Sequence, residues 1–499
     1  MKMFRNTFTK ILFFFLFSQL LSAQEINFKE VDEYIIKLMQ DWKIPGTSIA
    51  IVKDSALIYS KGYGFADLEQ KKDATANTIY GIASCSKAFT TCALGILVDQ
   101  QKLDWAKPRN NYMPELILND PYITANITAI DLVTHRSGYP SHDFLWYSSS
   151  FDRKELIKRM RYLDYSKSFR SYFQYNNLMY MAAGELIEKI SGKTWEVFVK
   201  ENIFIPLEMK NSNFTVKDLN KYNDVASAYR FEKGELLKID HYNADNLGGA
   251  GAINSSVNEM SNWLIMQLNK GKFKGKKVVN ENTLAFIQKP ATTVHTPIKY
   301  DELFYSSYAL GWYVTVYRGN MMLRHAGALD GVSTLTTFMP QKGYGVIIIA
   351  NLDYASSFTM AATLYIYDKL NKMEPVDWNE RYLAEKTEAE KKAKESENEE
   401  DKNFVKGTSP THKLIDYTGS YNNKAYGNIK IEEKNVQLYL TFNSITAKLI
   451  HQTYDTFKID NEYVFDYLKL SFILDDNGNI KSVCLPLESK VNDIEFVKL

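Results

Sequence analysis

This sequence contains few cysteines and has almost no net charge. The chain of 499 residues contains 3 cysteines, and its 60 basic residues nearly balance its 59 acidic ones. Cys85 and Cys92 lie two turns apart on one predicted helix, about 10 Å, which is too far for a disulfide bond. Cys484 is remote from both, so we expect three small buried hydrophobic side chains and no disulfide framework. A formal charge of +1 gives no reason to expect a nucleic-acid partner.

Clustered histidines and long hydrophobic runs are also missing. No apolar run approaches the length of a transmembrane helix, including the one at 11–21. The 7 histidines are scattered and form no His-Glu-x-x-His motif, so we expect neither a metal nor another cofactor. We expect structural roles for six of them: His135, His142, His241, His295, His412 and His451.

Residues 1–23 have the composition of a secretory signal peptide. Lys2, Arg5 and Lys10 precede the short apolar run, and Ser22-Ala23 provides a small residue at the cleavage site. No cysteine follows, so lipidation is not indicated. We expect an exported protein, periplasmic or extracellular, with no integral membrane segment after signal removal; the oligomeric state is left open.

The chain is too long for one hydrophobic core, so more than one domain is expected. Between residues 24 and 372 a helix is predicted at 28–39 and a β-hairpin at 47–62. Helical segments follow, and a helix closes the region at 356–370. Strands at both ends with helices between them predict an α+β fold, an antiparallel sheet built from both chain ends and faced by helices. The later strands are predicted at 309–317, 321–325, 332–339 and 345–350.

The character of the sequence changes after about residue 372. We interpret 373–412 as a charged linker, because 382–402 is nearly all Glu, Lys, Ala, Asn and Ser. Such a segment has little to bury, and a partly helical spacer is the favoured interpretation. Alternating strands return in 413–499, including one at 463–474 that leads into a turn at Asp475-Asp476-Asn477-Gly478. This region is predicted to be a separate all-β domain, a sandwich or a barrel.

The stretch 81–98 carries the first functional signal. Its only charge is Lys87, and its apolar residues leave no polar face, which predicts a helix buried on all sides. A buried lysine needs partners for its ammonium group or loses its charge part of the time. Ser84 lies three residues earlier, on the same face of the helix start. The pair can be a nucleophile with an adjacent base, or a capping serine followed by a lysine that extends to solvent.

Two further motifs follow in order, Tyr175-Asn176-Asn177 and His325-Ala326-Gly327. With Ser84-Cys85-Ser86-Lys87 they resemble the serine β-lactamase and penicillin-binding-protein superfamily, and most closely its class C β-lactamase, DD-peptidase and D-aminopeptidase branch. The resemblance covers about residues 28–370 and includes Gly248-Gly249-Ala250-Gly251. The tail resembles the accessory β-domain that follows some of these hydrolases.

The resemblance implies a role for each motif. Ser84 would form an acyl-enzyme, and Lys87 would accept its proton. Tyr175 would relay a proton to the leaving group, for which its phenol would need cationic neighbours that lower its pKa. Asn177 would hold the lysine and the substrate amide.

The third motif would form the other side of the substrate site. The backbone N–H groups of Ser84 and of Ala328, which follows Gly327, would form the oxyanion hole. Typical β-lactamases and DD-peptidases of this superfamily have lysine where this chain has His325. Histidine is only partly charged near its reference pKa of ~6.5. This favours esters, amidated peptides or D-amino-acid amides over substrates with a free carboxylate.

The predicted function is therefore that of an exported serine hydrolase. It would act on a small-molecule or peptide substrate, cleaving peptide, amide or ester bonds in D-amino-acid peptides, esters or β-lactams. One alternative is a penicillin-binding or wall-peptide-binding protein, or a sensor, that acylates with little turnover. The other is a glycan or surface binder that uses the aromatic-rich tail.

Overall fold

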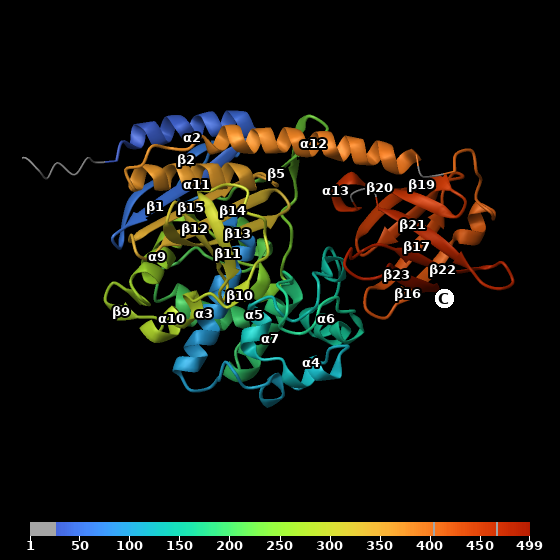
Figure 1. Ribbon diagram of the computed structural model, residues 1–499, viewed down its shortest axis with the longest axis horizontal. Coiled ribbons are helices and arrows are strands. Elements are labelled where there is room, and N and C mark those ends of the chain that lie inside the picture. Colours follow the sequence, from blue (N-terminus) through green and yellow to red (C-terminus); the bar gives the residue numbers. More distant parts are fainter. Residues whose placement is uncertain (1–25, 403–404, 466–467) are drawn as a thin grey trace, which may run out of the picture.

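The computed structural model describes residues 26–402, 405–465 and 468–499, so the expected signal peptide at 1–23 lies outside the described residues. A larger α+β domain and a C-terminal β-barrel stand side by side, and helix α12 (Trp378–Lys402) runs from one to the other (Figure 1). Within the described residues, no helix is long and apolar enough to cross a membrane. All three cysteines are free; Cys85 and Cys92 are buried, and Cys484 is partly exposed.

The larger domain is built on a nine-stranded sheet with the order β10-β11-β12-β13-β14-β15-β1-β2-β3. Its two edge strands are short: β10 (Thr292–Thr293) and β3 (Lys72–Asp73). Strand β1 (Gly46–Lys53) pairs antiparallel with β15 (Tyr344–Ala350), with Ile49 opposite Ile348. The two ends of the domain sequence therefore share one sheet, which confirms the predicted fold class. The other long strands are β2 (Ala56–Asp67), β11 (Leu303–Tyr308), β12 (Tyr313–Tyr317), β13 (Asn320–Leu329) and β14 (Val332–Met339).

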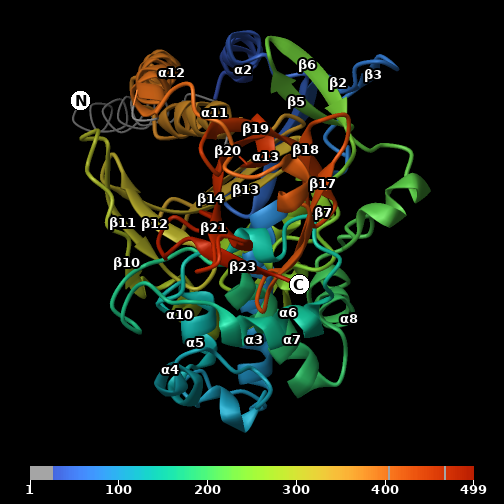
Figure 2. The same cartoon turned by 90° about the vertical axis from the view of Figure 1, so that its right-hand side faces the viewer.

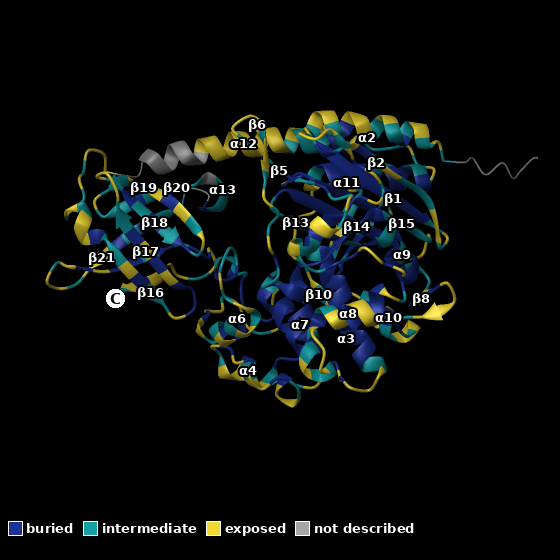
Figure 3. Ribbon diagram, turned by 180° about the vertical axis from the view of Figure 1, so that it is seen from behind, coloured by how far each residue is buried: buried dark blue, intermediate teal, exposed yellow. Residues whose placement is uncertain are grey.

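Helices cover both faces of this sheet. α2 (Phe28–Trp42) and α11 (Ser356–Leu370) pack together on one face, and α9 (Val257–Leu268) packs against β1 and β15 on the other. α3 (Ser86–Asp99) lies beyond it with α7 (Asn177–Ser191). Residues 86–97 of α3 are all buried, as its apolar sequence predicted, and both helices are dark blue in Figure 3.

The expected strand boundaries near the site were partly wrong. The strand predicted from 309 begins at Tyr313, because the chain turns at Gly311 in the left-handed region, with φ of 83°. A Cβ there would lie 2.8 Å from Thr91 Oγ1, so the turn passes directly over α3. Strand β13 continues past the predicted end at 325, because its last residues pair with β14. Strand β11 was not predicted.

The C-terminal domain is a closed eight-stranded antiparallel barrel, which decides between the two predicted all-β forms. It closes where β16 pairs with β23, and Figure 2 views the molecule from the barrel's side. Part of the strand expected from 463 is instead a short helix, α13 (Glu462–Phe465). The strands are β16 (Gly419–Asn423), β17 (Gly427–Glu433), β18 (Leu438–Phe442), β19 (Ile445–Thr453), β20 (Thr456–Asp460), β21 (Lys469–Leu474), β22 (Ile480–Leu485) and β23 (Ile494–Lys498).

The segment interpreted as a linker begins inside the larger domain. Trp378 is fully buried, and its Nε1 donates to Tyr317 Oη at 3.1 Å. Arg381 forms two hydrogen bonds of 3.0 Å with the Glu302 carboxylate. The middle of α12 is exposed and appears yellow in Figure 3. The spacer is thus helical, and its first two turns are anchored by the aromatic and arginine side chains that precede its charged stretch.

Candidate active site

Ser84 lies in a single 3-10 turn (η1, Ala83–Cys85) that leads directly into α3. Ala83 has a φ of 47°, in the left-handed region that residues with a side chain rarely adopt. Such conformations persist where the surrounding structure holds them, and they cluster at functional sites. Ser84 remains partly exposed at the helix start, whereas Lys87 is completely buried.

Lys87 Nζ lies within hydrogen-bond distance of three oxygen atoms. It is 2.9 Å from Ser84 Oγ, 2.8 Å from Asn177 Oδ1 and 2.8 Å from the Ala250 carbonyl oxygen. An ammonium group donates to all three. A neutral amine has two N–H groups and one lone pair, and the amide and carbonyl oxygens can only accept. The lone pair of the neutral amine therefore faces Ser84, the one partner of the three with a proton to give.

The charge state of Lys87 suits this arrangement. Burial lowers the pKa of Lys87 to about 7, and the charge of Asp143 acts in the opposite direction. A substantial fraction of the amine is therefore neutral at neutral pH, when it can accept the serine proton.

Asp143 fixes the orientation of the Asn177 amide. Asn177 Nδ2 donates to Asp143 Oδ1 at 3.0 Å, and Trp146 Nε1 donates to the same oxygen at 2.6 Å. Because the carboxylate takes the NH₂ end of the amide, the amide oxygen faces Lys87. Burial raises the pKa of Asp143, while these hydrogen bonds and the nearby Lys87 oppose the shift.

Tyr175 differs in charge from the sequence-based expectation. Its pKa is raised well above the ordinary value, mainly by burial and by the neighbouring Tyr313, whereas a hydrogen bond with the Ser84 side chain acts to lower it. The phenol is therefore protonated at neutral pH. Lys87 Nζ lies 4.9 Å from the ring centroid, but this amine carries its charge only part of the time near neutral pH and gives the phenolate little support.

His325 is buried and neutral. Its Nδ1 lies 2.7 Å from the Ala326 carbonyl oxygen, which can only accept, so Nδ1 carries the proton. Its Nε2 then accepts from Tyr308 Oη at 3.0 Å. Burial, followed by the charge of Lys87, lowers the pKa of His325 to about 3. In the free protein, His325 supplies no positive charge beside the nucleophile.

Strand β13 is pressed against η1 at Gly327. A Cβ on Gly327 would lie 2.3 Å from the Ile82 carbonyl oxygen, so no other residue fits without moving the backbone. Cys85 Sγ also donates to the His325 carbonyl oxygen at 3.1 Å. This close approach brings Ala328, the next residue of the strand, to the start of the helix that carries Ser84.

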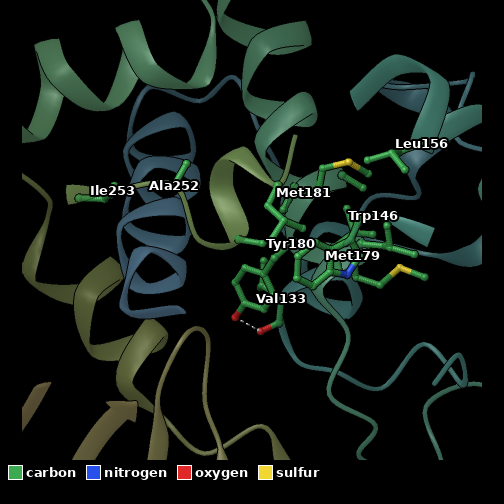
Figure 4. Close-up of a cluster of buried hydrophobic side chains, with 14 of the residues drawn as sticks. Val133, Trp146, Leu156, Met179, Tyr180, Met181, Ala252 and Ile253 are labelled. Atoms are coloured by element: carbon green, nitrogen blue, oxygen red, sulfur yellow. Dashed lines mark hydrogen bonds between the residues drawn. The ribbon is translucent and has the colours of Figure 1, made fainter. Parts of the chain in front are cut away.

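Helix α7 places Asn177 at its first turn. The Asn176 side chain caps the helix by accepting from the Met179 N–H at 2.9 Å. One turn further on, Tyr180 Oη donates to the Val133 carbonyl oxygen at 2.6 Å, within the buried cluster drawn in Figure 4. This hydrogen bond ties the start of α7 to the end of helix α5 (Ala129–Val133) and helps to fix the position of Asn177.

Two contributors to this site were missed in the sequence. Asp143 begins a single 3-10 turn (η3, Asp143–Leu145) without a recognisable motif, and no periodic signal pointed to it. The Ala250 carbonyl belongs to the Gly248-Gly249-Ala250-Gly251 stretch, which was noticed only as a likeness. A Cβ on Gly249 would lie 2.8 Å from Thr90 Oγ1, so the glycine allows this turn to approach α3. The role of this stretch could have been suspected from its glycines, whereas that of Asp143 could not.

Curated relatives of this chain include proteins named as hydrolases. Among curated relatives, an unguisins hydrolase of Aspergillus campestris is 29% identical over 431 residues, covering 81% of this chain and 78% of the relative. An unguisins hydrolase of Aspergillus violaceofuscus is 28% identical, covering 71% and 67%. The flp protein of Staphylococcus aureus is 24% identical, covering 65% and 63%.

Solved structures have the same fold. A penicillin-binding protein homologue of Pyrococcus abyssi, described as octameric, superposes with a TM-score of 0.61 at 22% identity, covering 95% of this chain and all of that one. A penicillin-binding protein of Bacillus halodurans gives a TM-score of 0.55 at 22% identity, covering 66% and 98%.

Family models account for both domains. A domain of unknown function, DUF3471, matches residues 404–498, which span the barrel. The Beta-lactamase model matches residues 31–368, which include all three motifs and most of the larger domain. This chain is a serine-hydrolase-type member of the Beta-lactamase family.

Proposed function

We propose that this protein is an exported serine hydrolase that cleaves peptide, amide or ester bonds through an acyl-enzyme on Ser84. The observation that carries the proposal is the set of three oxygen partners around Lys87 Nζ, which leaves Ser84 as the only proton donor to a neutral amine. Export rests on the composition of residues 1–23.

The reaction follows from the positions of the polar groups. Lys87 takes the Ser84 proton as Oγ bonds to the substrate carbonyl carbon, and the carbonyl electron pair moves to oxygen. The backbone N–H groups of Ser84 and Ala328 would bind this oxyanion. When the bond to the leaving group breaks, the Tyr175 hydroxyl gives that group a proton and regains one from Lys87. Attack by water on the acyl carbon then releases the product and restores the Ser84 hydroxyl.

The substrates proposed are acyl donors without a free carboxylate beside the cleaved bond, namely esters, amidated peptides or D-amino-acid amides. The neutral, internally hydrogen-bonded His325 supports this choice, because it provides no cation to offset such a carboxylate. The relatives named as unguisins hydrolases add support for a hydrolytic reaction.

Fluorophosphonate labelling tests the nucleophile. We expect one adduct on the Ser84 peptide of the wild type and of Ser168→Ala, a control at an exposed serine of the same domain. Ser84→Ala should not be labelled. Unchanged labelling of Ser84→Ala would refute the assignment.

Turnover separates the hydrolase from a binding protein or sensor that acylates. A chromogenic ester should be hydrolysed well beyond one equivalent per protein, with activity lost in Ser84→Ala. Release of a single equivalent followed by arrest would favour the sensor.

A further inference from the structure

The barrel contacts the larger domain through one of its two ends. In an antiparallel barrel, alternate connections lie at the same end. The connections that follow β16, β18, β20 and β22 form one rim, here called the docking rim, and all four reach the larger domain. The three connections that follow β17, β19 and β21 form the opposite rim. Contacts of the docking rim are made by residues 424–426, 443–444, 463–465 and Glu488.

Most of these contacts converge on one loop, residues 141–151, here called the clamp loop. Asn443 Nδ2 donates to the Phe144 and Tyr147 carbonyl oxygens at 3.2 and 2.9 Å. Ser444 donates to the Ser148 carbonyl oxygen through both its N–H, at 3.2 Å, and its hydroxyl, at 3.0 Å. The ring of Phe144 stacks on Phe465 with a centroid distance of 5.6 Å.

The start of the clamp loop is held still more closely. The Glu488 carboxylate, only 6% exposed, accepts from the Ser141 hydroxyl and from the His142 N–H, each at 2.9 Å. His142 Nε2 lies 2.8 Å from the Asp164 carbonyl oxygen and therefore carries the proton. Its Nδ1 then accepts from Tyr426 Oη at 2.7 Å. Two of the four hydrogen-bonding groups of His142 are thus engaged by the barrel, its N–H and its Nδ1.

The residue after His142 is Asp143, which orients Asn177. If Asp143 moved, the Asn177 amide could turn its NH₂ end toward Lys87 and compete with Ser84 for the lone pair of the amine. A rotated amide would therefore oppose activation of the nucleophile. The barrel also lies beside the site, because a cavity of about 320 Å³ is walled by Asp143, by Asp330 of the β13–β14 turn and by Tyr463 of the barrel.

We propose that the C-terminal barrel is part of the catalytic apparatus: its docking rim holds the clamp loop so that Asp143 keeps the Asn177 amide turned toward Lys87. Glu488 and Asn443 are positioning residues in this arrangement, since they act through the loop and not on the substrate. The inference rests on the proposed function, because its catalytic readout is acylation of Ser84.

Variants in the full-length protein test this role. Glu488→Ala, Asn443→Ala and the double variant remove hydrogen bonds to the clamp loop. The matched controls, Glu432→Ala and Asn477→Ala, change surface residues toward the opposite rim. We expect the double variant to lower the second-order rate constant of Ser84 labelling by at least about tenfold and to increase hydrogen exchange in residues 141–151. If the double variant fails to fold, the single variants test the proposal in its place, and we expect smaller effects from them.

A double-mutant cycle distinguishes positioning from a general structural effect. Asp143→Ala removes the acceptor for the Asn177 amide, whereas Asp143→Asn keeps an oxygen there and should retain more labelling. In the Asp143→Ala background, Glu488→Ala and Asn443→Ala should cause no further loss of labelling.

Two results would overturn the proposal, and a third would show instead that the proposed function is wrong. Labelling of the double variant within twofold of wild type overturns it. So does an undiminished effect of the rim variants in the Asp143→Ala background. If the wild type does not label at Ser84 at all, the proposed function is at fault, and exchange in 141–151 then decides by itself whether the docking rim holds the loop.

Discussion

At the scale of single residues, the buried amine of Lys87 is predicted to set the pH dependence of Ser84 labelling. Burial lowers its pKa to about 7, so the neutral, proton-accepting form is lost as pH falls through 7. We predict that the rate of Ser84 labelling rises with pH and is half-maximal near 7. The His325→Gln variant should keep this midpoint, because the pKa of His325, about 3, lies far below the range. A midpoint that disappears in this variant would assign the titration to His325 instead.

The charge of Asp143 gives a second residue-scale prediction. This carboxylate raises the pKa of Lys87, against the larger effect of burial. Asp143→Asn removes the charge while keeping an oxygen for Asn177, so the pKa of Lys87 should fall and the midpoint of the labelling profile should move to lower pH. A midpoint that moves upward would show that the carboxylate does not act on this lysine.

Lys87 and Tyr175 are predicted to act as one proton-transfer unit with Ser84. Lys87→Ala and Tyr175→Phe should each lower kcat/KM for a chromogenic ester by at least about 10²-fold, as expected for positioned acid–base groups. The double variant should lose much less than the product of the two effects. Tyr172→Phe, a change at an exposed tyrosine, is the matched control. Losses below about fivefold for both single variants, roughly 1 kcal/mol, would contradict the mechanism.

At the scale of elements, the contact between β13 and η1 forms one side of the site. Gly327→Ala would place a Cβ 2.3 Å from the Ile82 carbonyl oxygen and push the strand, with Ala328, away from Ser84. We expect kcat/KM to fall by about 10²–10³, the cost of losing one oxyanion-hole donor. Gly81→Ala is the control, because its nearest atom would be 3.6 Å away, an ordinary contact. Equal effects of the two substitutions would show that strand β13 does not contribute to the oxyanion hole.

Several elements could be predicted from local sequence alone. Strand β14 and helix α11 begin and end where the sequence pattern placed them, because that pattern lies within each element. Strand β11 was missed, since its residues gain a strand conformation only by pairing with β12. The short α13 replaced a predicted strand for a similar reason: its Phe465 packs on Phe144 of the other domain.

At the scale of the whole molecule, α12 and the docking rim join the two domains in different ways. Proteases should cut the middle of α12, where Lys391 and Lys394 are exposed to solvent. Because the docking rim remains bonded to the clamp loop, we predict that the two fragments stay together under native conditions and retain Ser84 labelling. Size-exclusion chromatography followed by denaturing electrophoresis checks this. Separate elution of an active larger fragment would mean that the barrel is dispensable.

The sequence by itself determined the pairing of the proposed nucleophile, Ser84, with its proposed base, Lys87. Ser84 and Lys87 are three residues apart at the start of one helix, and this spacing brings their side chains together through local backbone geometry. The order of the three motifs then predicted the family, and periodicity predicted an antiparallel sheet shared by both ends of the larger domain.

The tertiary structure alone decided how this pair is controlled. The family resemblance implied that Asn177, 90 residues from Lys87, would hold the lysine. The Ala250 carbonyl, 163 residues away, and Asp143, which acts through Asn177, were not foreseen. The anchor of the clamp loop, Glu488, is farther still, 346 residues from His142. Hydrogen bonds across such separations depend on how whole elements pack, so no local pattern encodes them.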